Sequence, residues 1–579
     1  MCGIAGHAGV LDDRLAGALD SLAHRGQDQQ GSDQLAGFAL GCRRLAITDE
    51  AAWQPLVIGE PGRRLAIVMN GSIAAPDSLR RVLAGHGEAC ATQNDAELPL
   101  RLYRSRGLPG LAGLRGQFAF AIRDEAEDSV VLGRDPFGEK PLFVGPGRPF
   151  PAFASTVAAL RMLVGEPSNG IDSVDLATFV RFGFLNLERS CFGSRLRAFP
   201  RGTFRAYYGD GRTAEASTDM PPAAERSEET LLALLRDAVG SRLHGDRPVG
   251  VFLSGGVDSS LIAALLSERG ARPLCLSLDF VGGSAEGARA ARTARHLGLP
   301  HDRRSVDHSL LDELPELVRH AGVPLGDPSL LAVVALARQA RQRGIGIVLS
   351  GEGGDELFLG YRRQRAIGWA RLARDILPPM VVNGCARATG RRALPRLARA
   401  VDGDYGELLA IAEQADVERL FGVAPRSIAA RTSDSAVIDA RELDVGEYLA
   451  WDLCPKLDLG SLVAGVEARS PFLDVHLLAW ARRWVRATGE ARGKLATRAV
   501  LARFLPQELR GGRKLGLAPP IASWLAESPW VADALASARS FDAGAALALW
   551  RELGAGLPAK AQLVFCLTSI ALWEQQCAS

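Results

Sequence analysis

The chain has 579 residues, of which 47% are hydrophobic and 23% charged, and this composition excludes the disordered, collagen-like and mucin-like classes. At roughly 150 residues per domain, the length predicts two to four domains. Lys and Arg together number 68 and Asp and Glu 66, which gives a net charge of +2 with no long block of either sign. We therefore expect neither nucleic acid nor a membrane surface as a partner.

The nine cysteines are scattered and include no C-x-x-C pair, which argues against a zinc ribbon and against a disulfide framework. The first residues, MCGIAGHAGV, lack the basic region and the long apolar region of a signal peptide. We expect a cytoplasmic protein.

The first two hundred residues consist of short apolar runs separated by turn-forming residues, and this rhythm predicts many strands. The clearest runs are 37–47, 63–72, 116–125 and 129–135. The segment 209–229 is poor in large apolar residues and rich in charge and turn formers. It is predicted to be a linker between a first domain, 1–208, and a second, 230–579.

Beyond this linker, strand-like and helical segments alternate, which predicts a parallel sheet flanked by helices. The strand-like segments are 248–253, 274–278 and 345–350, and the helical ones include 259–270 and 329–344. From about residue 360 onward the sequence is rich in Ala, Leu and Arg with helical periodicity. This last part is predicted to be mostly helical and packed on the α/β core.

Cys2 becomes a candidate nucleophile if Met1 is removed, because one residue then carries a free amine and a thiol. The amine has a reference pKa of about 8 and the thiol of about 8.5, so the amine can act as general base for its own thiol near neutral pH. For an isolated Met-Cys start, an ordinary residue after an initiator Met is the simpler interpretation. The motifs that follow decide against it.

Eight short motifs follow in order, and each alone is weak. They are CGIAG at 2–6, HRGQDQQG at 24–31, RRLAITD at 43–49, QPL at 54–56, NG at 70–71, NDAE at 94–97, LRGQFAFAIRD at 114–124 and GRDPFGEKPLF at 133–143. As a set they resemble the glutaminase domain of class II (N-terminal nucleophile) amidotransferases over residues 2–205. The resemblance implies an α+β sandwich of αββα type.

The same resemblance implies a glutamine site. Cys2 would attack the glutamine side-chain amide, and the Asn70 side chain and the Gly71 N–H would stabilise the oxyanion. Arg44 would bind the glutamine α-carboxylate and Asp95 its α-ammonium, the alternative for these two being a surface ion pair.

Two positions depart from the pattern of that family. Ser72 follows the Asn-Gly pair where family members usually carry Glu, and Gln27 stands where Pro is common. The change to Ser72 predicts weaker glutamine binding, and the change to Gln27 is expected to be the milder of the two.

The segment SGGVDSS at 254–260 lies between an apolar strand-like run and a helical run. A strand, a Gly-containing loop and a helix start place N–H groups around an anion, so a phosphate site is predicted; the alternative is a turn that merely contains Ser and Gly. No Lys follows the glycines, so this is not a Walker A loop. The segment resembles the PP-loop of ATP pyrophosphatases, which adenylate a carboxylate.

Acidic side chains in two loops are candidate ligands of Mg²⁺, which prefers oxygen. Asp258 lies in the first loop, and Glu352, Asp355 and Glu356 follow the strand-like run that ends at 350. Because ligands of α/β folds bind beyond the carboxyl ends of parallel strands, the two loops are expected to converge there.

Further motifs resemble the asparagine synthetase family, and the match is collinear over nearly the whole chain. They are LSGEGGDELFLGY at 349–361, CPKLDLGS at 454–461, GVEARSPFLD at 465–474, GKLATRAVL at 493–501 and RKLGLAPPIASWL at 513–525. The resemblance implies an α/β PP-loop domain with a helical C-terminal part, ATP and Mg²⁺ as cofactors, and ammonia that travels internally from Cys2 to an acyl-adenylate.

Residue roles in this half also follow from the resemblance. The ATP and pyrophosphate site would comprise Leu253, Ser254, Gly255, Gly256, Asp258, Ser259 and Gly351. Asp258 and Asp355 would bind the metal ion. Lys494 would neutralise charge at the reacting phosphate and carbonyl, and Glu352 would lie near the amine or the substrate. From the residues alone, Lys494 at a helix start is expected to be solvated. Glu467 is then expected to be a structural partner of Arg469.

The function that this resemblance implies is an ATP-dependent ligase that hydrolyses glutamine and converts aspartate to asparagine. Gly322, Val323 and Leu517 depart from the family pattern in the half that recognises the carboxylate. They leave open a specialised amide-forming enzyme, similar to β-lactam synthetases or lasso-peptide macrocyclases, that adenylates a different carboxylate. A regulator with relic sites is disfavoured because Cys2, the PP-loop and Lys494 occur together. The expected partners are small molecules, namely glutamine, ATP and aspartate or another carboxylate, and the sequence leaves a homodimer open.

Overall fold

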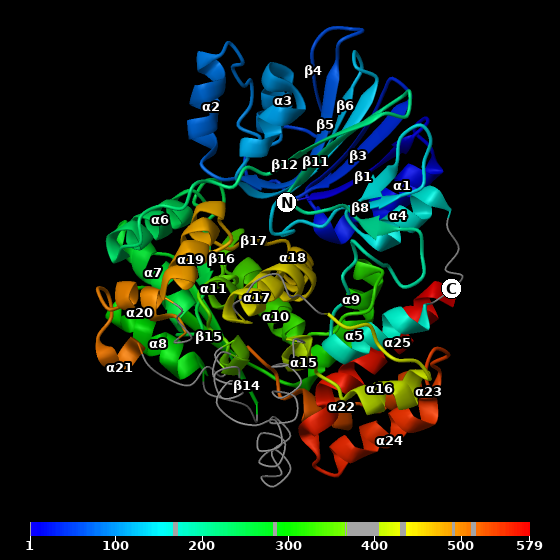
Figure 1. Ribbon diagram of the computed structural model, residues 1–579, viewed down its shortest axis with the longest axis vertical. Coiled ribbons are helices and arrows are strands. Elements are labelled where there is room, and N and C mark those ends of the chain that lie inside the picture. Colours follow the sequence, from blue (N-terminus) through cyan, green and yellow to red (C-terminus); the bar gives the residue numbers. More distant parts are fainter. Residues whose placement is uncertain are drawn as a thin grey trace.

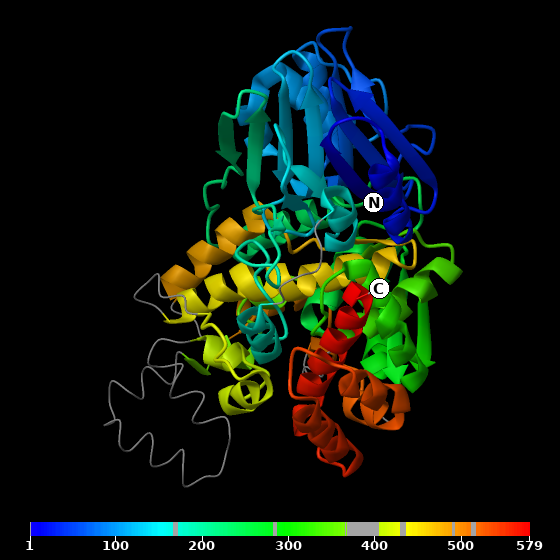
Figure 2. The ribbon, with the colours of Figure 1, turned by 90° about the vertical axis from the view of Figure 1, so that its right-hand side faces the viewer.

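The computed structural model describes residues 2–165, 172–281, 286–364, 366–367, 405–428, 436–488, 493–510 and 517–578. Two antiparallel sheets form the N-terminal part, and a parallel sheet surrounded by helices forms the C-terminal part (Figure 1). Figure 2 shows the two sheets at one end of the molecule and the last helices, α22 to α25, toward the other. The expected fold classes of both halves are confirmed.

The first sheet has the strand order β10-β8-β9-β1-β3-β2. Its strands are β1 (Cys2–Ala8), β2 (Gln29–Leu35), β3 (Phe38–Arg44), β8 (Phe143–Gly145), β9 (Ala152–Ala154) and β10 (Arg197–Ala198). The second sheet has the order β12-β11-β7-β6-β5-β4. Its strands are β4 (Leu56–Ile58), β5 (Leu65–Ile73), β6 (Gly116–Asp124), β7 (Ser129–Arg134), β11 (Thr203–Tyr208) and β12 (Thr213–Ser217).

Helices cover the outer face of each sheet, which completes the αββα sandwich. Helices α1 (Asp13–Ser21) and α4 (Val157–Val164) contact the first sheet, and α3 (Glu97–Gly110), with α2 (Pro76–Gly85) against it, contacts the second. Both faces of the central strands are therefore buried, so these strands have continuous apolar runs. In β5, Ala66 and Val68 pack between the sheets, whereas Ile67 and Met69 pack toward α3.

Strand β12 lies inside the segment that the sequence predicts as a linker. It pairs with β11 from Thr203↔Ser217 to Tyr207↔Thr213 and extends the second sheet by one strand. Helix α6 (Glu228–Gly240) begins at the far end of the predicted linker. Helix α5 (Ser173–Phe182) packs on α16 and α25 of the C-terminal part rather than on the sandwich (Figure 1).

The parallel sheet has the order β15-β14-β13-β16-β17. Its strands are β13 (Val249–Phe252), β14 (Leu274–Phe280), β15 (His301–Val306), β16 (Ile347–Leu349) and β17 (Glu467–Arg469). Strands β13, β14 and β16 coincide with the three predicted strand-like segments, whereas β15 is not predicted. Strand β17 comes from the GVEAR motif, far along the chain, and lies beside β16.

Helices surround this sheet and form most of the remaining described chain. The longer ones are α7 (Val257–Glu268), α8 (Glu286–His296), α10 (Ser329–Gln342), α18 (Cys454–Leu462), α19 (Val475–Thr488), α24 (Ala543–Gly554) and α25 (Ala561–Ala578). The shorter ones are α9 (Leu314–Ala321), α11 (Gly354–Leu357), α15 (Gly406–Leu409), α16 (Gln414–Phe421), α17 (Ala436–Leu443), α20 (Leu495–Leu501), α21 (Gln507–Arg510), α22 (Ile521–Glu527) and α23 (Pro529–Ala536). A π-helical stretch, Asp444–Leu453, leads into α18. No described helix is long and apolar enough to cross a membrane.

Candidate functional site

Cys2 and Asn70 are brought together where β1 and β5 face each other across the sandwich. The backbone N–H of Cys2 donates to Asn70 Oδ1 at 2.9 Å. Both residues are buried, and Asn70 Nδ2 has no hydrogen-bond partner among the described residues. A buried donor without a partner is costly unless a ligand uses it. Asn70 Nδ2 is thus available to an oxyanion formed beside Cys2.

The thiol of Cys2 is set up to ionise. Cys42 lies on β3, two residues before Arg44, which pairs with Cys2 in the register of β1 and β3. A hydrogen bond with Cys42 lowers the pKa of Cys2 most, and the positive N-terminus and Arg44 lower it further. These effects outweigh burial and bring the pKa of Cys2 to about 6. Thiolate is the nucleophilic form, so Cys2 is reactive at neutral pH.

Gly71, the second member of the Asn-Gly pair, requires glycine. Its φ is +130°, and a Cβ there would lie 2.0 Å from the carbonyl oxygen of Gln117 on β6. The backbone can therefore approach β6 only without a side chain. This local geometry fixes the Asn70 side chain opposite Cys2.

Arg44 ends β3 and is buried, with its guanidinium in contact with the loop that follows. Its terminal nitrogens donate to Gln29 Oε1, to the carbonyls of Thr48 and Asp49 at 2.7 Å each, and to the carbonyl of Ala52. The side chain therefore anchors the loop 48–52. Its binding to a glutamine carboxylate stays a prediction.

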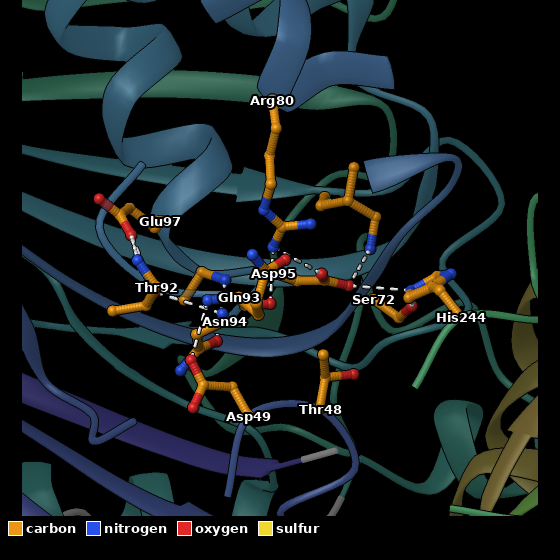
Figure 3. Close-up of polar contacts among 12 residues, drawn as sticks. Thr48, Asp49, Ser72, Arg80, Thr92, Gln93, Asn94, Asp95, Glu97 and His244 are labelled. Carbon is orange, nitrogen blue, oxygen red and sulfur yellow. Dashed lines mark hydrogen bonds and ion pairs between the residues drawn. The ribbon is translucent and has the colours of Figure 1, made fainter. Parts of the chain in front are cut away.

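Asp95 lies in the turn before α3 and is held from several sides (Figure 3). The N–H of Ile73 donates to Asp95 Oδ2 at 2.9 Å, and Arg80 Nη2 lies 3.7 Å from Oδ1. The buried carboxylate of Glu97 accepts from the N–H groups of Ala91 and Thr92 and so fixes the loop that carries Asp95. Asp95 thus lies at the end of β5, close to the Asn-Gly pair.

Ser72 and Asp95 both contact His244, which belongs to the C-terminal part (Figure 3). His244 Nε2 lies 2.7 Å from Ser72 Oγ and 3.1 Å from Asp95 Oδ2. The sequence does not predict this contact, because 172 residues separate Ser72 from His244 along the chain and 149 separate Asp95 from His244.

The second predicted site lies in a cavity of about 440 Å³, here called the C-terminal cavity. All seven residues predicted for the ATP and pyrophosphate site line it. The Gly255 φ is +70°, and a Cβ there would lie 2.8 Å from Arg289 Cγ, so glycine is needed in this loop. Gly256 N-caps α7, whose positive end faces the cavity as an anion site requires.

Lys494, Asp258 and Asp355 converge at one wall of the C-terminal cavity. Lys494 Nζ forms ion pairs with Asp258 and, at 2.5 Å, with Asp355 Oδ1. Burial lowers the pKa of Lys494, but the charges of Asp258 and Asp355 outweigh it and raise the pKa above its ordinary value. Lys494 is therefore buried and charged, and the solvated alternative is wrong.

Asp258 and Asp355, which both face the Lys494 ammonium group, also fit the ligand set of Mg²⁺. The ion takes one or two carboxylates when phosphates supply further oxygens. Asp258 and Asp355 are the residues that would hold it. When bound, Mg²⁺ would supply charge neutralisation for the phosphates.

Glu352 lies in the C-terminal cavity beside residues that the sequence analysis did not single out. Lys456 Nζ lies 3.0 Å from Asp327 Oδ2 and 3.9 Å from Glu352 Oε1. Burial lowers the pKa of Lys456, but Asp327, Glu352 and Asp452 raise it well above its ordinary value. The signals that point to them are the place of Lys456 in the CPKLDLGS motif at 454–461 and the place of Asp327 in the segment DPS at 327–329.

A second cavity, of about 120 Å³, lies between the two parts of the chain and is called the interface cavity. Arg25, whose Nε donates to the carbonyl of Cys2 at 3.4 Å, lines it from the N-terminal part. Asp327 and Lys456 line both this cavity and the C-terminal cavity. The two cavities therefore share a wall.

Glu139 is a further carboxyl group that lines the interface cavity. It is buried, and its Oε1 has no hydrogen-bond partner among the described residues. Burial, and then the charge of Asp135, raise the pKa of Glu139 to about 8. Glu139 is therefore mostly protonated at neutral pH.

One predicted structural pair is confirmed. Glu467 and Arg469 of β17 form a buried ion pair at 2.5 Å. Of the motif at 513–525, residues 513–516 lie outside the described residues, and Leu517 lines the C-terminal cavity.

Comparison with known proteins agrees with this geometry. The family model for a glutamine amidotransferase domain matches residues 1–217, and the model for asparagine synthase matches residues 230–575. A putative glutamine-hydrolysing asparagine synthetase of Mycobacterium tuberculosis is 31% identical and covers 94% of this chain and 91% of its own. Asparagine synthetase 1 of Bacillus subtilis is 28% identical over 87% of this chain and 83% of its own. The amidase chyE of Penicillium rubens is 28% identical over 61% of this chain and 56% of its own. The chain belongs to the asparagine synthase family, with an N-terminal glutamine amidotransferase domain.

Proposed function

We propose that the chain hydrolyses glutamine at Cys2 and uses the ammonia to convert aspartate to asparagine through an aspartyl-adenylate. The observation that carries this proposal is the interface cavity, which reaches from Arg25, beside Cys2, to Asp327 and Lys456 of the C-terminal cavity. A cavity that begins beside Cys2 and shares a wall with the predicted ATP site favours transfer of a small nucleophile between the two sites.

In the first step, the Cys2 thiolate attacks the amide carbon of glutamine and forms a tetrahedral adduct. The free Asn70 Nδ2 and the Gly71 N–H would donate to its oxyanion, each donor contributing about 3 kcal/mol. Expulsion of ammonia leaves a thioester, which water hydrolyses to glutamate and free Cys2.

In the second step, a carboxylate oxygen of the acceptor attacks the α-phosphorus of ATP and pyrophosphate leaves. Lys494, buried and charged beside Asp258 and Asp355, would neutralise the charge that develops on the phosphate oxygens. Ammonia then attacks the acyl carbon, and AMP leaves as the amide forms.

A second candidate is a specialised enzyme that amidates a different carboxylate. The apolar end of the interface cavity, lined by Val323, Pro324 and Leu325, favours it, since Gly322 and Val323 stand where many members of the family carry acidic residues. The amidase relative of Penicillium is compatible with this alternative.

One assay separates these functions. Pyrophosphate release is measured with ATP, Mg²⁺ and aspartate, with either glutamine or ammonium chloride as nitrogen source, and the product is identified by mass. Asparagine with both donors supports the proposal. Turnover only with another carboxylate would support the specialised enzyme. Cys2→Ala should abolish the glutamine-dependent reaction and leave the ammonium-dependent one, and a variant that still hydrolyses glutamine would refute the nucleophile.

A further inference from the structure

The segment Ser241–Arg247 joins α6 to β13 and lies against the glutamine site. The N–H of Ala75 donates to the Ser241 carbonyl at 3.1 Å, and the N–H of Asp49 donates to Asp246 Oδ2 at 2.8 Å. Arg247 Nε donates to the Ala46 carbonyl at 3.2 Å. This segment of the C-terminal part is therefore attached to loops that surround the glutamine site.

Within this segment, the side chain of His244 touches both Ser72 and Asp95. Its Nδ1 lies 3.1 Å from the Ser241 carbonyl oxygen, which belongs to the same segment. This contact orients the ring and directs Nε2 at Ser72 Oγ and Asp95 Oδ2 (Figure 3). The ring is thus fixed at one nitrogen by its own segment and contacts the N-terminal part with the other.

The two oxygens of Asp95 have different surroundings. Oδ2 has His244 Nε2 and the Ile73 N–H as partners, whereas Oδ1 is buried without a hydrogen-bond partner among the described residues and has only Arg80 at 3.7 Å. Because Oδ2 is held from two sides, the carboxylate cannot rotate freely, and Oδ1 keeps one direction. A buried acceptor that is fixed in this way suits a ligand ammonium group.

His244 is also attached to the C-terminal site through its backbone. Its carbonyl accepts from Arg469 Nη1 at 2.6 Å, and the carbonyl of Arg469 accepts from the N–H of Ser350, which precedes Gly351. These contacts use the backbone of His244 and not its side chain, so a substitution of the side chain leaves them in place.

We propose that His244 is a positioning residue for glutamine, contributed by the C-terminal part, which orients Asp95 and Ser72 toward the substrate α-ammonium. This inference rests on the proposed function, in which Asp95 binds that ammonium. The glutamine site is then complete only when the two parts of the chain are in contact.

Steady-state kinetics of the full chain test this role. His244→Ala should raise KM for glutamine at least tenfold with less than a threefold change in glutaminase kcat, and the ammonium-dependent reaction should stay unchanged. His244→Gln, which keeps a donor near the Nε2 position, should recover part of the lost affinity. An unchanged KM in His244→Ala would overturn the proposal.

Arg247→Ala is the matched control, because Arg247 links the same segment to Ala46 and Asp28 and forms no hydrogen bond or ion pair with Ser72 or Asp95 in the described part of the chain. It should leave KM for glutamine within twofold. If Arg247→Ala raises KM as much as His244→Ala, or if both variants lose the ammonium-dependent reaction equally, His244 has a general structural role and the proposal is wrong.

Covalent labelling of Cys2 distinguishes failure of the inference from failure of the proposed function. Iodoacetamide needs only the thiolate, whereas 6-diazo-5-oxo-L-norleucine carries the amino acid group that Asp95 would recognise. The native chain should react with both, and His244→Ala should react at least tenfold more slowly with the second reagent alone. A native chain that reacts only with iodoacetamide would refute the glutaminase. Equal rates of labelling by the second reagent in both chains would refute the role of His244.

Discussion

Arg25 of the N-terminal part donates to Asp458 of helix α18 at 2.6 Å, and both side chains are buried. Lys140 Nζ reaches the other oxygen of Asp458 at 3.0 Å. The two positive charges, and Arg25 above all, hold the pKa of Asp458 below its ordinary value against the effect of burial. This cluster joins the two parts of the chain beside the interface cavity.

Asp458→Asn should destabilise the protein strongly, because Arg25 and Lys140 would stay buried without a negative partner. Removal of one member of a buried ion pair costs about 3–5 kcal/mol. Urea unfolding of the full chain measures the loss. Asp210→Asn, in the exposed pair with Arg212, is the control and should leave the midpoint unchanged. Equal midpoints for the two variants would contradict a structural role for the cluster.

Asn70→Ala should lower kcat for glutamine hydrolysis about 100- to 1,000-fold, as the loss of one oxyanion donor does in other hydrolases. The partnerless Asn70 Nδ2 is the reason. Glutamate release measures the effect, and amide formation from ammonium chloride is the control that should persist. A variant with unchanged glutamate release would remove Asn70 from the oxyanion site.

Alkylation of Cys2 should follow the titration of a thiol with a pKa of about 6. The thiolate fraction, and with it the rate of reaction with iodoacetamide, should rise from pH 5 and level off above about pH 7. Peptide mapping by mass spectrometry follows Cys2 separately from the other cysteines. Cys42→Ala removes the hydrogen bond that lowers this pKa most and should shift the rise to higher pH. A midpoint near 8.5 in the native chain would contradict the assignment.

Lys494→Gln should reduce pyrophosphate release at least 1,000-fold and change ATP affinity much less. The reason is that, in the proposed function, Lys494 would act on charge that develops during the reaction, while the loop 254–259 and the start of α7, which line the cavity, would hold the nucleotide. Lys494→Arg should not restore the rate, because a guanidinium fork does not replace a compact ammonium between Asp258 and Asp355. Pyrophosphate release and equilibrium dialysis with ATP separate the two effects. Parallel loss of binding and rate would indicate a structural role.

Glu139→Gln should remove a pH-dependent loss of stability. The folded chain keeps the proton of Glu139 up to about pH 8, whereas the unfolded chain releases it near the ordinary value of 4.5. The folded state thus binds more protons between these values, and the native chain loses stability as pH rises through this range. The variant should be relatively more stable at pH 8.5 than at pH 5 in urea unfolding. A constant difference between the two chains would show that Glu139 ionises normally.

The sequence predicts those elements that are determined by residues close together along the chain. The apolar runs at 37–47 and 63–72 are β3 and β5 because both faces of these strands are covered. The loop 254–259 lines its cavity as predicted because strand, glycine and helix start are adjacent in the chain. Periodicity and motif spacing are enough for such elements.

Features that depend on distant partners are not predicted. His244 and Ser72 are 172 residues apart, and Arg25 and Asp458 are 433 apart, and no local pattern links them. Strand β12 is exposed on alternate residues and rich in Ala, so its sequence is similar to that of a linker. The carbonyl contacts of Arg44 likewise come from a loop whose path only the fold determines.

Asp327 and Lys456 form a wall common to the two cavities. In the proposed function, ammonia crosses this wall and so would not mix with the pool of ammonium in the medium. Nitrogen-15 supplied in the side chain of glutamine should then appear undiluted in the product, even when unlabelled ammonium is abundant outside. The isotope ratio of the product is therefore a direct measure of how well this wall keeps the two reactions sealed from water.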